Sequence, residues 1–202
     1  MTIALIGASG NAGSRILKEL SDRGHHVTAL ARHPDQIPGL PNVTAKQADV
    51  FDRDALAALL KGHEAVISAV HFTASDPGLL IAAVKASGVA RYLVVGGAGS
   101  LEVAPGVRVI DAPDFPAAYK EEALKGAAFL DLLRQEPELD WTFLSPSALF
   151  VAGQRTGRFR LGGDQLLVSD QGSSISFEDF AVALVDEIEA PAHRRQRFTV
   201  GY

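Results

Sequence analysis

An apolar run that leads directly into a glycine-rich turn opens the chain, and no other feature constrains the fold as strongly. Residues 2–13 read TIALIGASGNAG, so a strand expected over residues 2–6 is followed by glycines at positions 7, 10 and 13. The next residues, SRILKELSDRGH, place their apolar side chains on one face of a helix expected over residues 11–23. A strand, a tight glycine turn and a helix N-terminus in this order predict a cradle for the pyrophosphate of a dinucleotide.

Each glycine of the turn has a separate role in such a cradle. Gly7 allows the sharp turn out of the strand, Gly10 lets the backbone approach the phosphates, and Gly13 lets the helix pack closely on the sheet. The neighbouring backbone amides donate to phosphate oxygens with the help of the helix dipole. These amides belong to Ser9, Asn11 and Ala12.

Strand and helix signals alternate along the rest of the chain. Further strands are expected over residues 27–31, 42–48, 64–70, 91–97, 141–145 and 197–201, and further helices over residues 52–60, 76–87, 116–135 and 177–189. Repeated β-α-β units with apolar strands predict an α/β fold with a doubly wound parallel sheet, Rossmann-like, in the order 3-2-1-4-5-6 plus a closing strand. The glycine-rich stretch 152–175, with short strands at RFRL and QLLVS, indicates a small substrate-side lobe over residues 146–196.

Composition narrows the class of protein. The chain has 202 residues and a formal net charge of −5, so we expect a single domain over residues 1–202 without the basic surface that binds nucleic acid. It has no cysteine and no His-x-x-x-His pattern, which predicts no metal site. No apolar run approaches the roughly 18 residues of a membrane span. We expect a cytoplasmic protein that acts on a small molecule, as a monomer or a homodimer.

The end of the second strand bears on which dinucleotide fits. Sites for NAD carry an acidic residue there for the ribose 2′-hydroxyl, but this chain reads ALARHP, with Arg32 and His33 and no carboxylate before Asp35. An arginine at this position can pair with a 2′-phosphate, which predicts NADP(H) rather than NAD(H). Asp49, in QADVFD, is either a partner for the adenine amino group or a helix cap together with Asp52.

Further cofactor contacts are expected in the loops that follow the other strands, because ligands of a doubly wound sheet bind at the carboxyl ends of its strands. The residues predicted for these contacts are Val50, Ala69, Val70, Gly97, Pro146 and Ser147.

Several longer stretches resemble one group of proteins. They are IALIGASGNAGSRI, ALARHP, QADVFD, VVGGAGSL, PAAYKEEALKGAAFLDLLR, DWTFLSPSALF and ISFEDFA, and they cover most of the chain. The chain thereby resembles the atypical short-chain dehydrogenase/reductase proteins of the NmrA-like and NADH-flavin reductase type, which include the flavin/biliverdin reductase B-like proteins. The resemblance implies a Rossmann-like core, an NADP(H) site and a short C-terminal lobe.

The chain departs from that superfamily in its tyrosines. Many of its enzymes use Tyr-x-x-x-Lys on a helix, so that the lysine assists proton transfer by the tyrosine. Here the residue four after Tyr119 is Ala123, and the residue four after Tyr92 is Gly96. Lys120 would point about 100° away from Tyr119 on a helix. Tyr119 either lines the pocket or, as we favour, is a packed helix residue. Alcohol oxidation, epimerisation and dehydration through a tyrosine are therefore disfavoured.

Hydride transfer from a nicotinamide to a flavin, a quinone or a similar planar acceptor needs no such dyad, since the cofactor supplies the chemistry. A flavin would be a substrate here rather than a bound cofactor. The candidate catalytic residues are Ser100, either a pocket hydroxyl or a turn residue, and His71, a candidate proton donor after the fourth strand. The segment 101–115, with its Pro-Gly turn, is expected to form a substrate lid. The alternative function is a non-catalytic NADP(H)-binding redox sensor that acts through a protein partner.

Overall fold

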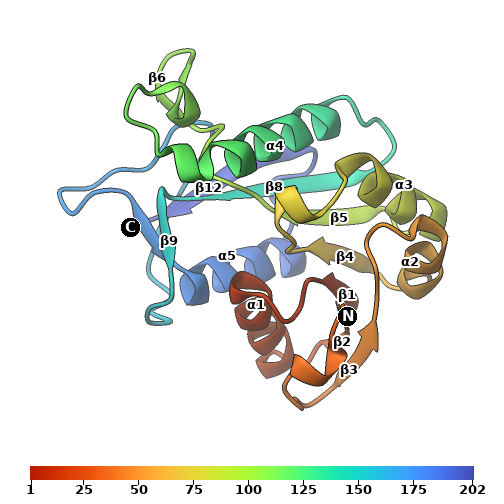
Figure 1. Cartoon of the computed structure of the whole chain (residues 1–202). Helices are drawn as coiled ribbons and strands as arrows, with labels where there is room; N and C mark the ends of the chain where they lie inside the picture. The colour runs from red at the N-terminus through yellow and green to blue at the C-terminus, as the bar shows by residue number, and fades with distance from the viewer.

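A twisted, largely parallel sheet forms the centre of the molecule (Figure 1), in a computed structural model that describes all 202 residues. Its eight strands lie in the order β10-β12-β8-β5-β4-β1-β2-β3, and every neighbouring pair is parallel except β10 with β12. In chain order, these strands are β1 (Thr2–Ile6), β2 (His26–Ala31), β3 (Val43–Gln47), β4 (Ala65–Ser68), β5 (Arg91–Val95), β8 (Asp140–Pro146), β10 (Arg160–Gly162) and β12 (Gln196–Gly201).

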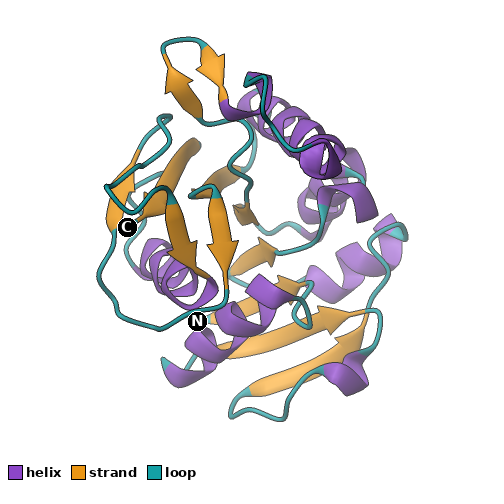
Figure 2. Cartoon of the chain, turned by 60° about the vertical axis from the view of Figure 1, so that its left-hand side comes forward, coloured by secondary structure: helices purple, strands orange, loops and turns teal.

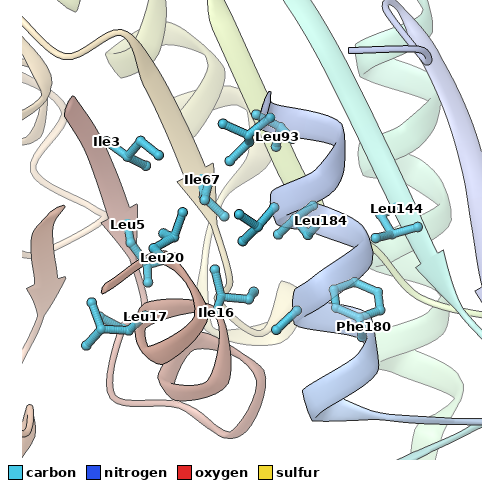
Figure 3. Close-up of a cluster of buried hydrophobic side chains, with 14 of the residues drawn as sticks. Ile3, Leu5, Ile16, Leu17, Leu20, Ile67, Leu93, Leu144, Phe180 and Leu184 are labelled. Atoms are coloured by element: carbon cyan, nitrogen blue, oxygen red, sulfur yellow. The ribbon is translucent and has the colours of Figure 1, made fainter. Parts of the chain in front are cut away.

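Helices cover both faces of this sheet. On one face α1 (Asn11–Asp22) packs against α5 (Phe177–Glu189); the other face carries α2 (Arg53–Leu60), α3 (Pro77–Ser87) and α4 (Ala117–Arg134). Strand side chains alternate between the two cores, as a pleated strand requires. In β1, Ile3 and Leu5 join the core under α1 and α5 (Figure 3), whereas Ala4 and Ile6 join the opposite core.

Local signals place the helix ends. The side chain of Asp52 accepts from the amide of Ala55 at 3.0 Å at the start of α2, and Ser176 accepts in the same way from Asp179 at 3.0 Å at the start of α5. Gly88 ends α3 with a left-handed φ of 79°.

The predicted Rossmann-like fold, its strand order and its closing strand are confirmed. The structure adds short strands that the sequence pattern did not indicate. In the 101–115 segment, β6 (Glu102–Ala104) and β7 (Val107–Arg108) form a hairpin that projects from the body of the molecule (Figure 2). β9 (Leu149–Val151) pairs with β11 (Ser174–Ser176), while QLLVS, expected as a strand, makes only isolated bridges.

The segment 146–196 has two roles in the structure. Its helix α5 belongs to the layer that covers the main sheet, whereas β9 and β11 form a separate pair beside it (Figure 1). None of the helices is both long and apolar enough to cross a membrane.

Candidate functional site

The glycine turn between β1 and α1 has the geometry of a phosphate cradle. Gly10 occupies the N-cap position of α1 without a side-chain cap, and the backbone amides of Asn11, Ala12 and Gly13 have no acceptor within the protein. These amides, together with the positive end of the helix dipole, suit an anion.

The three glycines differ in what surrounds them. Gly7 has a φ of 82°, and a Cβ there would lie 2.5 Å from the carbonyl oxygen of Ala69. A Cβ on Gly13 would overlap the carbonyl oxygen of Gly7. A Cβ on Gly10 would meet the protein only at 3.4 Å, at the same oxygen, so the space beside Gly10 is open. Gly7 and Gly13 are therefore required by the fold, and Gly10 leaves room for a ligand.

Two cavities adjoin at this turn. One, of about 320 Å³, lies over the carboxyl ends of β1, β2 and β4; the other, of about 500 Å³, lies between the helix α4 and the β9 region. They share four lining residues, so they form one continuous groove. The shared residues are Gly10, Ala69, Val70 and His71.

Most of the predicted cofactor residues lie on this groove. Those in the first cavity are Gly7, Ser9, Gly10, Arg32, Asp49, Val50, Ala69 and Val70. Those in the second are Gly10, Asn11, Ala12, Ala69, Val70, Gly97, Pro146 and Ser147. Gly13 lies behind the turn as a packing residue, and the exposed His33 lines neither cavity. The hydroxyl of Ser147 is buried and donates to the carbonyl of Val200 at 3.1 Å.

The first cavity is lined on one side by a cationic side chain that has no ion-pair partner. Arg32 is exposed and takes part in none of the ion pairs of the structure. Asp49 does not cap α2, since that role belongs to Asp52; its Oδ1 accepts from the amide of Phe51 at 2.9 Å. Phe51, which the sequence reasoning missed, lines the cavity and is 57% exposed.

The second cavity has aromatic walls. Phe72 and Tyr119 come from one side, and Phe150 and Phe177 from the other, where their rings stack edge to face at 4.5 Å between centroids. Of the two interpretations of Tyr119, the favoured one is wrong: the residue is 67% exposed and lines the cavity, as the other interpretation predicts. The helix α4 presents it there because its opposite face fills the core.

Glu122, one helical turn after Tyr119, is a pocket residue that the sequence reasoning missed. Its carboxylate accepts from the amides of Phe72 and Thr73, both at 2.8 Å, and from the Thr73 hydroxyl at 2.7 Å. Nδ1 of His71 lies 3.2 Å from Oε1 of the same carboxylate. Burial raises the pKa of Glu122, but the hydrogen bonds from Thr73 and Phe72 outweigh it, so this pKa lies below its usual value. The i, i+3 spacing from Tyr119 was the available signal.

Ser100 lines neither cavity. Its hydroxyl lies 3.4 Å from Nη1 of Arg197, whose Nε donates to Asp164 at 2.7 Å. The geometry thus gives Ser100 a structural contact, and its catalytic role stays a prediction. Residues of the expected lid, 101–115, also line neither cavity, because Leu101 and Ile110 anchor that segment in the protein.

The groove fits a dinucleotide. Free amides at the start of α1 and the open space at Gly10 suit a pyrophosphate, and Arg32 places a cation beside the same cavity. Comparison with known proteins agrees: residues 7–191 match a family model described as NAD(P)H-binding. The chain belongs to this NAD(P)H-binding family.

Relatives of this NAD(P)H-binding protein match it over nearly their full lengths. The uncharacterized protein YwnB of Bacillus subtilis is 41% identical over 99% of this chain and 98% of its own. A solved structure from Streptococcus pneumoniae, named a "putative NADH-flavin reductase", has a TM-score of 0.82 and 36% identity, with 100% of this chain and 99% of that chain covered. A "putative epimerase" from Bacteroides thetaiotaomicron has a TM-score of 0.95 and 43% identity, with 100% and 96% covered. These relatives support an NmrA-like, flavin reductase-like family of NAD(P)H-dependent oxidoreductases.

Proposed function

We propose that the protein is an NADPH-dependent reductase that transfers a hydride to an uncharged planar acceptor, such as a flavin without phosphate or a quinone. One observation carries the proposal: the phosphate cradle and an aromatic-walled cavity form one groove through four shared residues. A nicotinamide held at that junction would face an acceptor in the second cavity.

The preference for NADPH is supported by the rim of the first cavity. Arg32 is an exposed guanidinium without an ion-pair partner, at the end of β2. A guanidinium pairs bidentately with a phosphate, so a 2′-phosphate would add a charge-assisted contact there. Asp49 retains Oδ2 for the adenine amino group, because only its Oδ1 is bonded to the protein.

The acceptor class follows from the second cavity. Its ionisable lining residues are His71, Tyr119 and Glu122, and none of them is a fixed cation. A phosphate or carboxylate on the acceptor would meet the carboxylate of Glu122 instead of an arginine or lysine. The rings of Phe150, Phe177 and Tyr119 offer surfaces on which a planar molecule stacks. These features favour riboflavin and simple quinones over FMN and FAD.

The chain's own groups do the positioning. When bound, the reduced dinucleotide supplies the hydride. The amides of Asn11 and Ala12 hold the pyrophosphate, and Gly97 and Pro146 border the space for the nicotinamide. The aromatic walls hold the plane of the acceptor, and the polar residues His71 and Tyr119 of the same cavity can deliver a proton to it.

The dyad needed for tyrosine-based epimerisation or alcohol oxidation is missing. Tyr119 is on the cavity wall, but the position one turn further along α4 is Ala123, which packs on Gly99, so no ammonium group accompanies the tyrosine. This favours hydride transfer to an acceptor that solvent or a nearby histidine can protonate.

The test is the loss of NADPH absorbance with purified protein, NADPH or NADH, and a panel of riboflavin, FMN, FAD and simple quinones. We expect turnover with NADPH preferred, and faster turnover with riboflavin and quinones than with FMN. Arg32→Glu should weaken NADPH binding far more than NADH binding. Arg108→Glu should change neither, because Arg108 is a half-buried arginine on the hairpin that pairs with Asp111 and lines neither cavity. Equal losses for both cofactors would refute the 2′-phosphate contact. Tight NADPH binding without turnover on the whole panel would favour the redox sensor instead.

A further inference from the structure

We propose that Glu122 is a positioning residue for His71, and that His71 delivers the proton that completes reduction of the acceptor. The inference rests on the proposed reductase function, and its first test is independent of turnover. The two residues lie 51 positions apart and are brought together by the packing of α4 against η2 (Phe72–Ala74).

His71 stands where both cavities meet. It follows β4 at the N-terminal end of η2, lines both cavities, and leaves 83% of its side chain exposed. The ionisable groups that share these cavities with it are Arg32, Asp49, Tyr119 and Glu122. Of these, Glu122 alone is hydrogen-bonded to the imidazole.

The carboxylate determines which ring nitrogen carries the proton. A carboxylate only accepts hydrogen bonds, so the 3.2 Å contact requires a hydrogen on Nδ1. Neutral His71 therefore has a free lone pair on Nε2, and its protonated form carries an Nε2–H that is free to donate to a molecule in the groove. A carboxylate that holds Nδ1–H and supports a charged imidazole is the arrangement of a histidine acid–base catalyst.

Glu122 itself is held rigidly. Three other hydrogen bonds, from the amides of Phe72 and Thr73 and the hydroxyl of Thr73, fix both of its oxygens. These contacts and the resulting low pKa keep the carboxylate ionised and fixed in orientation. Thr73 and Phe72 follow His71 in sequence, so the same carboxylate positions the backbone that carries the imidazole.

The proton step balances the reaction. Addition of a hydride to a quinone or flavin leaves one negative charge, on an oxygen or a ring nitrogen of the acceptor. The Nε2–H bond of His71 breaks, a new O–H or N–H bond forms on the acceptor, and the electron pair stays on Nε2. His71 becomes neutral with Nδ1–H still bonded to Glu122, and water returns the proton.

The first test uses cofactor-free protein and nitrogen NMR of the histidine rings. At a pH where the imidazole is neutral, we expect His71 to carry its proton on Nδ1 in the wild type. Glu122→Gln should reduce this preference. The amide has one acceptor oxygen, whereas the donors from His71, Phe72 and Thr73 use both oxygens of the carboxylate. Glu121→Gln, the exposed neighbour on the same helix, is the matched control and should leave the spectrum unchanged. A wild-type His71 protonated on Nε2, or an unchanged spectrum in Glu122→Gln, would overturn the pairing.

The second test is a double-mutant cycle on kcat, where a merely structural role for Glu122 predicts a different result. We expect His71→Asn to lower kcat about tenfold or more, toward the range of general acid catalysis. Glu122→Gln should lower kcat similarly in the wild type but less than twofold in the His71→Asn background. His26→Asn, an exposed histidine at the far end of β2, serves as control.

Equal losses in both backgrounds would show that Glu122 acts only through the η2 turn, and a larger loss in Tyr119→Phe than in His71→Asn would assign the proton to the tyrosine. Each of these outcomes refutes the inference while leaving the reductase function intact. Absence of wild-type turnover with every acceptor would instead refute the proposed function.

Discussion

Addition of one methyl group to the glycine turn should lower NADPH affinity at Gly10 but lower stability at Gly13. At Gly10 the φ of −74° and ψ of 173° are open to alanine, and the new Cβ would touch the protein only at 3.4 Å. We expect Gly10→Ala to change the free energy of unfolding by less than about 1 kcal/mol, since a poorer N-cap and a less flexible unfolded chain offset each other. The methyl would, however, occupy the space that the pyrophosphate needs. If two charge-assisted hydrogen bonds of about 1.5 kcal/mol each are lost, NADPH affinity falls about 100-fold.

At Gly13 the new Cβ would lie 2.9 Å from the carbonyl carbon of Gly7 and overlap its oxygen, so the helix must move away from the turn. Overpacking of this kind costs about 1–3 kcal/mol, which lowers Tm by about 4–8 °C for a 2 kcal/mol loss in a chain of this size.

Thermal unfolding without ligand and fluorescence titration with NADPH would separate the two effects. Gly10→Ala should retain the wild-type Tm and lose affinity, whereas Gly13→Ala should lose Tm. An alanine at position 10 that binds NADPH within twofold of wild type would refute the cradle geometry. An alanine at position 13 that leaves Tm unchanged would refute the packing argument.

Two further predictions concern buried carboxylates. Glu187 accepts from Nη2 of Arg91 at 3.0 Å and pairs with Nδ1 of His193 at 2.8 Å. Glu187→Gln should therefore lower the free energy of unfolding, measured in urea, by about 3 kcal/mol. A loss below about 1 kcal/mol would contradict a stabilising role for this buried ion pair. Burial raises the pKa of Glu187, but the hydrogen bonds from His193 outweigh it, and Arg155 is the main cause of the lowered pKa of Glu19. Groups with a lowered folded pKa stabilise the protein above their unfolded value, so unfolding free energy should be retained above pH 4.5 and lost as pH falls through the folded values. A stability profile that stays flat to pH 3 would contradict the sign.

The parts of the fold that the sequence predicts are those set by local pattern and handedness. A window of about ten residues is enough to predict the glycine turn, the helix caps at Asp52 and Ser176, and each apolar strand. Right-handed crossovers then fix the strand order, which the structure confirms.

The missed elements depend on distant partners. β9 and β11 have three residues each, and Leu149 pairs with Ser174, so no periodicity within either segment predicts them. Arg197 lies 97 positions from Ser100, so a hydroxyl in a glycine-rich loop gave no sign of this contact. Glu122 lies on the same face of α4 as Tyr119, but its contact with the His71 turn appears only once α4 packs against η2.

The two halves of the groove also differ in whether local sequence or distant packing determines them. The dinucleotide side is built from consecutive β-α-β units in which backbone contacts require Gly7 and Gly13, so these two positions tolerate little change. The proposed acceptor side is built from α4, β9 and the start of α5. Its walls are the side chains of Tyr119, Phe150 and Phe177, none of which comes from a strand of the main sheet. Proteins with this frame can therefore keep one cofactor and differ in acceptor. Two relatives whose names differ, a "putative NADH-flavin reductase" and a "putative epimerase", are both structurally similar over the whole chain and are consistent with such a frame. Acceptor specificity in this protein should thus be altered by substitutions at Tyr119, Phe150 and Phe177 with NADPH affinity retained.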